Sequence, residues 1–121
     1  MSTILVIDDD ELFRGLLKAA FEKTGYHVLV SEDGEHGVET AKEHVPDVIV
    51  TDMSMPRMTG WDVLDALNQD ARTENIPAVV LSAHRTSQDM DEAYARGCAG
   101  YMVKPVPLPD LLAKVKEILD R

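Results

Sequence analysis

The stretch Ile4-Leu5-Val6-Ile7-Asp8-Asp9-Asp10-Glu11 decides the fold. Its first half is an unbroken run of aliphatic side chains, and its second half is a run of acids. A continuous apolar run suits a strand that is covered on both faces, which is typical of a parallel sheet. The abrupt change to acids predicts that the strand ends at residue 7 and that the acids lie in a loop at the edge of the sheet.

Four further apolar runs follow along the chain, at residues 28–30, 48–50, 78–81 and 100–103. The segments between and after these runs carry apolar residues at helical spacing. We expect a first helix that is capped by Asp10 and stops at Gly25, and others over residues 34–44, from about residue 59, over 87–96 and over 108–119. The side chains expected to face the sheet are Leu12, Phe13, Leu16, Leu17, Phe21, Val38, Ala41, Val45, Trp61, Leu64, Leu67, Met90, Ala93, Tyr94, Leu108, Leu111, Leu112, Val115, Ile118 and Leu119.

This alternation of strands and helices predicts an α/β three-layer sandwich with an open parallel sheet, because parallel strands need right-handed crossover helices. In such sheets, ligands bind in a crevice at the carboxyl ends of the strands. Functional side chains are therefore expected directly after the strands.

Length and composition indicate one globular domain over residues 1–121. The chain is 45% hydrophobic and 28% charged, which excludes a disordered tail or a fibrous repeat. Its net charge of −10 argues against direct binding to nucleic acid or to an anionic membrane surface, because that charge repels phosphates.

The cellular location expected from the sequence is the cytoplasm. A single cysteine, Cys98, excludes an internal disulfide. The N-terminus carries no basic leader, and no apolar run is long enough to cross a membrane.

Five polar side chains follow strands and are expected to meet at one edge of the sheet: Asp8, Asp9, Asp52, Ser82 and Lys104. Three carboxylates in one crevice repel one another unless a hard cation lies among them. Mg²⁺ fits this requirement, because it takes oxygen ligands and is commonly held by one or two carboxylates together with a phosphate oxygen.

The same residues predict a phosphoryl-transfer chemistry. Asp52 is the expected nucleophile, which would attack phosphorus and become an acyl phosphate. The ammonium group of Lys104 would hold Asp52 in place and later bind a phosphoryl oxygen, and the Ser82 hydroxyl would donate to another.

At these positions the chain resembles a receiver domain of the two-component response regulator family. The resemblance covers essentially the whole chain and appears in the expected order. The matching motifs are residues 4–11, Asp47-Val48-Ile49-Val50-Thr51-Asp52-Met53-Ser54-Met55-Pro56, Thr59-Gly60, Val80-Leu81-Ser82-Ala83 and Gly100-Tyr101-Met102-Val103-Lys104-Pro105.

The resemblance implies a flavodoxin-like fold with strand order 2-1-3-4-5 and five helices. It also implies that Asp52 accepts a phosphoryl group from a sensor histidine kinase or a phosphotransfer protein. Asp9, Asp52 and the backbone carbonyl of Ser54 would bind Mg²⁺, and Asp8 would help largely through water. The Lys104-Pro105 peptide bond is expected to be cis.

As a signalling switch, the chain is expected to be no enzyme beyond its own phosphorylation and dephosphorylation. By the family resemblance, the hydroxyl of Ser82 moves toward the new phosphate and the ring of Tyr101 turns inward behind it. The fourth helix, fifth strand and fifth helix then present the signal to an output domain or a downstream protein, and a free-standing receiver fits the sequence.

Three other functions remain as alternatives. In a Mg²⁺-dependent phosphatase of the haloacid dehalogenase type, Asp8 would be the nucleophile and Asp10 the general acid, which leaves Asp52 without a role. A flavodoxin-like cofactor binder would need a first loop rich in Ser, Thr and Gly, whereas three acids repel a phosphate. A phosphate-independent interaction domain would not respond to beryllofluoride and Mg²⁺.

Overall fold

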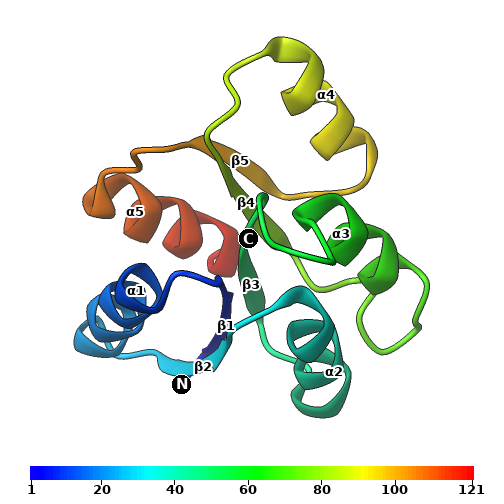
Figure 1. The fold of residues 1–121 in the computed structure, drawn as a ribbon. Coiled ribbons are helices and arrows are strands. Elements are labelled where there is room, and N and C mark those ends of the chain that lie inside the picture. The colour runs from blue at the N-terminus through cyan, green and yellow to red at the C-terminus, as the bar shows by residue number, and fades with distance from the viewer.

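Strands and helices alternate without exception along the computed structural model, which describes residues 1–121 (Figure 1). The strands are β1 (Thr3–Ile7), β2 (His27–Ser31), β3 (Val48–Asp52), β4 (Ala78–Ser82) and β5 (Gly100–Val103). The helices are α1 (Glu11–Lys23), α2 (Gly34–His44), α3 (Gly60–Asn68), α4 (Ser87–Ala95) and α5 (Leu108–Leu119). None of these helices combines the length and the apolar character that a membrane span requires.

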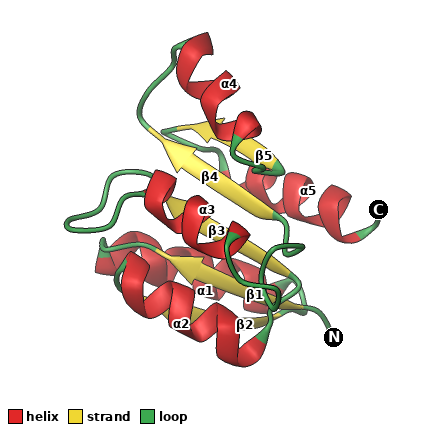
Figure 2. Ribbon diagram, turned by 90° about the vertical axis from the view of Figure 1, so that its right-hand side faces the viewer, coloured by secondary structure: helices red, strands yellow, loops and turns green.

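All five strands are parallel and lie in the order β2-β1-β3-β4-β5, which confirms the predicted topology (Figure 2). The first crossover runs from β1 outward to β2, and the chain then returns past β1 to build β3, β4 and β5. The winding direction therefore reverses between β1 and β3. Ligands bind to sheets of this kind beside that point, at the carboxyl ends of the strands.

The helices form a layer on each face of the sheet. Figure 1 shows α1 and α5 on one face and α2, α3 and α4 on the other. Each face has its own apolar core, one centred on Leu5, Ile49 and Val80 and the other on Val6, Val50 and Leu81. Because successive strand residues point to opposite faces and both faces are covered by helices, the strands need continuous apolar runs, such as residues 4–7 of β1 and 48–50 of β3.

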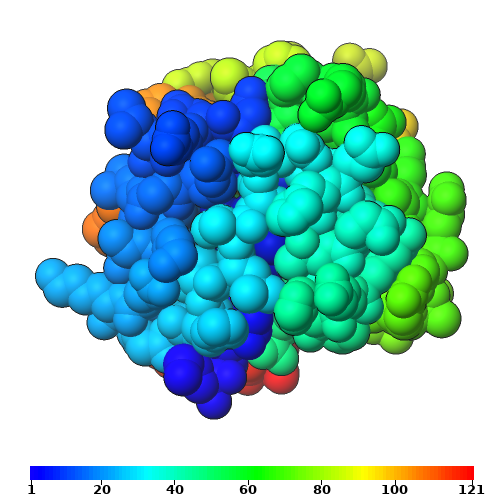
Figure 3. All heavy atoms as spheres, turned by 60° about the horizontal axis from the view of Figure 1, so that its bottom comes forward, coloured from blue at the N-terminus to red at the C-terminus, as the bar shows by residue number.

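At the β2 edge, α1 and α2 approach each other from the two faces. Figure 3 shows α1, in blue, and α2, in blue-green, on either side of the segment that contains β2. Both helices contact β2, so that this edge strand is partly shielded from pairing with another chain.

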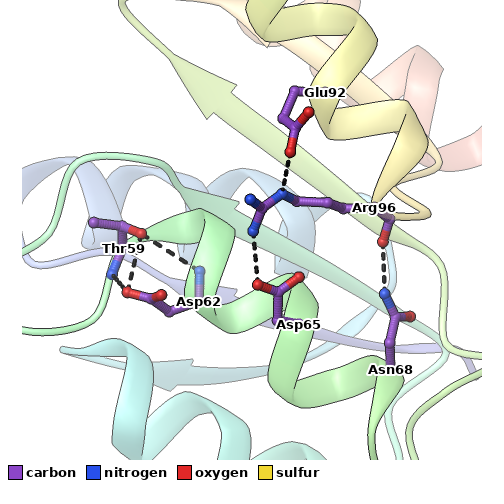
Figure 4. Close-up of polar contacts among 6 residues, drawn as sticks. All are labelled: Thr59, Asp62, Asp65, Asn68, Glu92 and Arg96. Atoms are coloured by element: carbon purple, nitrogen blue, oxygen red, sulfur yellow. Dashed lines mark hydrogen bonds and ion pairs between the residues drawn. The ribbon is translucent and has the colours of Figure 1, made fainter.

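Side chains cap the starts of α1 and α3, and the sequence predicts the cap at Asp10. The Asp10 carboxylate accepts hydrogen bonds from the backbone N–H groups of Leu12 and Phe13, and it thereby caps α1. At the start of α3, Thr59 and Asp62 form a reciprocal capping box (Figure 4). Both caps pair N–H groups that the first turn of a helix leaves without a partner.

Four apolar side chains that were expected to face the sheet are exposed instead: Leu12 at 87%, Leu16 at 50%, Val45 at 51% and Tyr94 at 48%. The inward line of α1 consists of the partly buried Phe13 and the buried Leu17 and Phe21, spaced by four residues. Leu12 and Leu16 are each one residue earlier and hence about 100° around the helix. Tyr94 is displaced in the same way from the buried Ala93, and Val45 follows α2 in a left-handed conformation with φ 46°.

Helix α4 is joined to α3 through Arg96. The guanidinium group of Arg96 donates to Asp65, within α3, at 2.6 Å and to Glu92 at 2.8 Å (Figure 4). It also lies 5.2 Å from the centre of the Trp61 ring. Trp61 was predicted to face the sheet and is half-buried. The backbone carbonyl of Arg96 accepts a hydrogen bond from Asn68. These contacts fix the carboxyl end of α4 against α3.

Candidate phosphoacceptor and metal site

Strand register brings the predicted site residues to one level at the carboxyl edge of the sheet. Ile7 lies opposite Thr51, so Asp8 and Asp52 follow at the same height on adjacent strands. Ser82 lies opposite Val103, and Lys104 follows directly. The peptide bond between Lys104 and Pro105 is cis, as the family resemblance implied.

The acids and the lysine meet closely. One carboxylate oxygen each from Asp8, Asp9 and Asp52 lie within 4.8 Å of one another. The Lys104 Nζ atom is 2.9 Å from Asp52 Oδ1 and 3.9 Å from Asp8 Oδ2. The structure therefore brings together the residues on which the sequence prediction of a phosphoacceptor site depends.

Asp8 is the most deeply buried of these acids, with 1% of its surface exposed. One carboxylate oxygen accepts the backbone N–H of Asp10 at 2.8 Å, whereas the other, Oδ2, makes no hydrogen bond. Burial is the largest cause that raises the pKa of Asp8 to about 6, and repulsion from Asp52 adds to it. The Asp10 N–H and the Lys104 ammonium oppose this rise in pKa.

This set of donors fits a hard divalent cation. Buried polar atoms in native proteins nearly always have a hydrogen-bond partner, but Asp8 Oδ2 has none, and its nearest cation, Lys104 Nζ, is 3.9 Å away. A cation among the three carboxylates would supply that partner and would relieve their mutual repulsion. Ser54, the source of the expected carbonyl ligand, lies two residues after Asp52 in the β3–α3 loop and is exposed.

Ser82 and Tyr101 are linked through the backbone of His84. The Ser82 hydroxyl oxygen accepts the N–H of His84 at 3.0 Å. The Tyr101 hydroxyl donates to the carbonyl of the same residue at 2.9 Å. Tyr101 is 7% exposed, so its ring lies inward in this structure. A movement of the Ser82 hydroxyl would thus act on the loop that also holds Tyr101.

A hollow of about 410 Å³ lies beside the site, between the β3–α3 loop and His84. Its lining residues are Met53, Ser54, Met55, Thr59, Trp61 and His84. On this side α3 begins very close to the backbone of β3. A Cβ atom on Gly60 would lie 2.9 Å from the Cα of Met53 and 3.0 Å from the Asp52 carbonyl oxygen, so only glycine fits without a shift.

Two contacts near the site were not predicted from the sequence. The guanidinium group of Arg14 donates to the backbone carbonyl of Asp8 at 2.8 Å. The Phe13 ring, which was assigned only to the core, lies 5.0 Å from the Lys104 Nζ atom. The predicted helix start does place both residues near the first turn of α1. No sequence signal pairs Phe13 with Lys104, because they are 91 positions apart and lie on different elements.

Fold and site together define a receiver domain, and the comparison with protein families agrees. The model for the response regulator receiver domain matches residues 4–116. The chain belongs to this family. As such it is the receiver domain of a two-component response regulator, and phosphorylation-dependent switching is the general function of the family.

Individual relatives share this architecture. The DNA-binding dual master transcriptional regulator RpaA of Synechocystis sp. is 35% identical over 121 residues, and the chain spans half of that protein's length. The polar-differentiation response regulator DivK of Brucella ovis is 27% identical over 97% of this chain and 95% of its own. The chemotaxis protein CheY4 of Vibrio cholerae superposes with a TM-score of 0.92 at 27% identity, over 98% of both chains.

Membership of the family carries several general properties. Receiver domains bind Mg²⁺ at an acidic pocket, and this chain has a cluster of three acids, Asp8, Asp9 and Asp52. Receiver domains interact with histidine kinases or phosphotransfer proteins and with output partners. Homologous receiver domains are signalling proteins and generally not enzymes.

Proposed function

We propose that residues 1–121 form one phosphoacceptor domain in which Asp52 accepts a phosphoryl group from a histidine kinase or phosphotransfer protein in the presence of Mg²⁺. The observation that carries this proposal is the 2.9 Å contact between Lys104 Nζ and Asp52 Oδ1 beside two further carboxylates. Among the three acids, only Asp52 has this close contact with a cationic side chain able to bind a phosphoryl oxygen.

In the proposed reaction, a carboxylate oxygen of Asp52 attacks the phosphorus atom. A new O–P bond forms and the P–N bond to the donor histidine breaks, so that the electron pair leaves with the imidazole nitrogen, which takes up a proton. The Lys104 ammonium passes from Asp52 to a phosphoryl oxygen. The Ser82 hydroxyl keeps its own hydrogen for donation to a second phosphoryl oxygen, since its contact with His84 uses only the oxygen lone pair.

We assign the metal ligands to Asp9, Asp52 and the backbone carbonyl of Ser54, with Asp8 acting largely through water. When bound, Mg²⁺ neutralises charge on the transferring phosphoryl group. The protein holds the carboxylates ready for this ion. Asp8 is fixed by the backbone N–H of Asp10 and, through its own carbonyl, by Arg14.

We place the switch at Ser82 and Tyr101 and the output surface on α4, β5 and α5. Phosphorylation adds close to two negative charges at Asp52. Movement of the Ser82 hydroxyl toward that charge would lengthen the hydrogen bond that it accepts from the N–H of His84, whose carbonyl accepts the hydroxyl of Tyr101. The signal would reach an output domain or a separate protein in the cytoplasm, without direct contact of this domain with nucleic acid.

Geometry weighs against the phosphatase alternative. In that mechanism Asp8 is the nucleophile, yet it lies deeper than Asp52, with 1% of its surface exposed, and one of its carboxylate oxygens already accepts the backbone N–H of Asp10. Asp10, the acid of that mechanism, uses its carboxylate to cap α1. The capping role of Asp10 therefore competes with the general-acid role that a phosphatase requires of it.

Labelling with acetyl phosphate and Mg²⁺ tests the proposal. Intact mass spectrometry of the wild type should show the gain of one phosphoryl group, which is absent in Asp52→Asn and after addition of EDTA. The matched control is Asp91→Asn, an exposed acid on α4, which should label like the wild type. Labelling that persists in Asp52→Asn would refute the assignment of Asp52. Repeated hydrolysis of phosphate esters would favour the phosphatase, and no response to beryllofluoride would favour an interaction module.

A further inference from the structure

The ammonium group of Lys104 has a third neighbour besides the two carboxylates. Its Nζ atom lies 5.0 Å from the centre of the Phe13 ring, while it is 2.9 Å from Asp52 Oδ1 and 3.9 Å from Asp8 Oδ2. A cation over the face of an aromatic ring within about 6 Å is attracted by the negative charge density of that face. The ammonium group is therefore held from two chemically different sides.

The two partners differ in how firmly the fold holds them. Phe13 is fixed on the first turn of α1, because the Asp10 carboxylate accepts its backbone N–H and its ring packs on the core of that face. Lys104 has a flexible four-carbon stem and a side chain that is 30% exposed. It borders an open hollow of about 420 Å³, which Phe13 also lines. The position of the Phe13 ring is thus fixed by the fold, whereas the Lys104 ammonium beside it can move.

We propose that Phe13 is a positioning residue that holds the Lys104 ammonium at the phosphoacceptor site through a cation–π contact. This inference rests on the proposed function. Its physical basis is that the attraction of the ring does not depend on the charge of Asp52. Phosphorylation of Asp52 transfers the negative charge from the carboxylate oxygen that the ammonium faces at 2.9 Å to the phosphoryl oxygens farther along the side chain. The ring remains, so the ammonium stays within reach of the new phosphoryl oxygens.

Substitutions at position 13 distinguish the effect of the π face of the ring from the effect of its size. Phe13→Leu keeps an apolar side chain in the core and removes the π face, and it should slow labelling by acetyl phosphate about threefold to tenfold. Phe13→Tyr retains the π face and should keep most of the rate. Leu12→Ala is the control, since Leu12 lies on the same helical turn with 87% of its surface exposed and should label like the wild type.

A double-mutant cycle distinguishes positioning from a general structural effect. If Phe13 acts through Lys104, then Phe13→Leu should cause no further loss of rate in a Lys104→Met background. If Phe13→Leu slows the wild type and Lys104→Met by the same factor, the ring does not act through the ammonium and the inference is wrong. An equal rate for Phe13→Leu and the wild type would also overturn it.

The side-chain NMR signals of Lys104 give a readout that needs no labelling. The ring should shift the Hε resonances of Lys104 upfield, and this shift should persist with beryllofluoride and Mg²⁺ and disappear in Phe13→Leu. Lys104→Met identifies the signals. Loss of the shift on addition of beryllofluoride would contradict the inference even if labelling succeeds. If the wild type labels no faster than Asp52→Asn, the proposed function fails, while the NMR result still decides the contact.

Discussion

Replacement of Asp8 by asparagine should stabilise the metal-free protein at neutral pH. Asparagine has the size of the aspartate side chain and keeps an oxygen that can accept the N–H of Asp10. The substitution removes a carboxylate charge that is almost wholly buried beside Asp52. One oxygen of that carboxylate, Oδ2, has no hydrogen-bond partner. Ionised Asp8 thus costs folding free energy unless a cation lies beside it.

The magnitude follows from the pKa. Burial raises the pKa of Asp8 from 3.8 to about 6, so between these values the folded protein holds a proton that the unfolded chain has lost. The free energy of unfolding therefore falls as the pH rises through this window, and it falls no further once the pH is well above 6. The reduction amounts to about 3 kcal/mol at pH 7.5 and to about half of that at pH 5.

Urea unfolding of the wild type and Asp8→Asn in EDTA, at pH 5 and pH 7.5, measures this effect. The variant should be more stable by about 3 kcal/mol at pH 7.5, with a clearly smaller gain at pH 5. Mg²⁺ should stabilise the wild type more than the variant and narrow the difference. Asp91→Asn is the control for removal of an exposed charge. An equal gain at both pH values, or no gain at pH 7.5, would refute this reasoning.

The remaining predictions concern the scaffold around the site. Arg96→Ala should lower the melting temperature by about 3 °C or more, because it removes the ion pairs to Asp65 and Glu92 and the Trp61 contact, whereas Arg121→Ala should change it little. Gly15→Ala should raise the free energy of unfolding by about 0.5 to 1 kcal/mol, since a Cβ there meets nothing within 4 Å. Gly60→Ala should lower it by about 1 to 3 kcal/mol, since its Cβ would meet the β3 backbone. Chemical denaturation checks both glycine variants, and equal effects at positions 15 and 60 would contradict the packing account.

The alternation of strands and helices could be predicted from the sequence because its two signals are local, whereas the strand order was implied by the family resemblance. Continuous apolar runs mark strands that are buried on both faces, and the caps at Asp10 and Thr59 mark helix starts. The strand ends in turn predict which acids meet, since parallel strands place their carboxyl ends at one edge. For this reason the Asp8, Asp9, Asp52 and Lys104 cluster was accessible without a structure.

What the sequence could not supply is the distinction between apolar side chains that lie on neighbouring lines of one helix. Leu12 and Phe13 are equally apolar, yet a rotation of about 100° leaves the first exposed and packs the second, partly buried, against the core. The contact of Phe13 with Lys104 depends on how α1 packs beside the end of β5, which no local pattern encodes. Likewise, the lack of a hydrogen-bond partner for Asp8 Oδ2 follows from its burial by the tertiary structure, which the sequence does not show.

Chemical mapping of the modified side chain tests the central claim most directly. Borohydride reduction of the acetyl phosphate-treated protein converts an acyl phosphate to homoserine, which peptide mass spectrometry can locate. We expect homoserine at position 52 alone, and only when Mg²⁺ was present during labelling. Homoserine at position 8 or 9, or no homoserine in a protein that has gained a phosphoryl group, would contradict it.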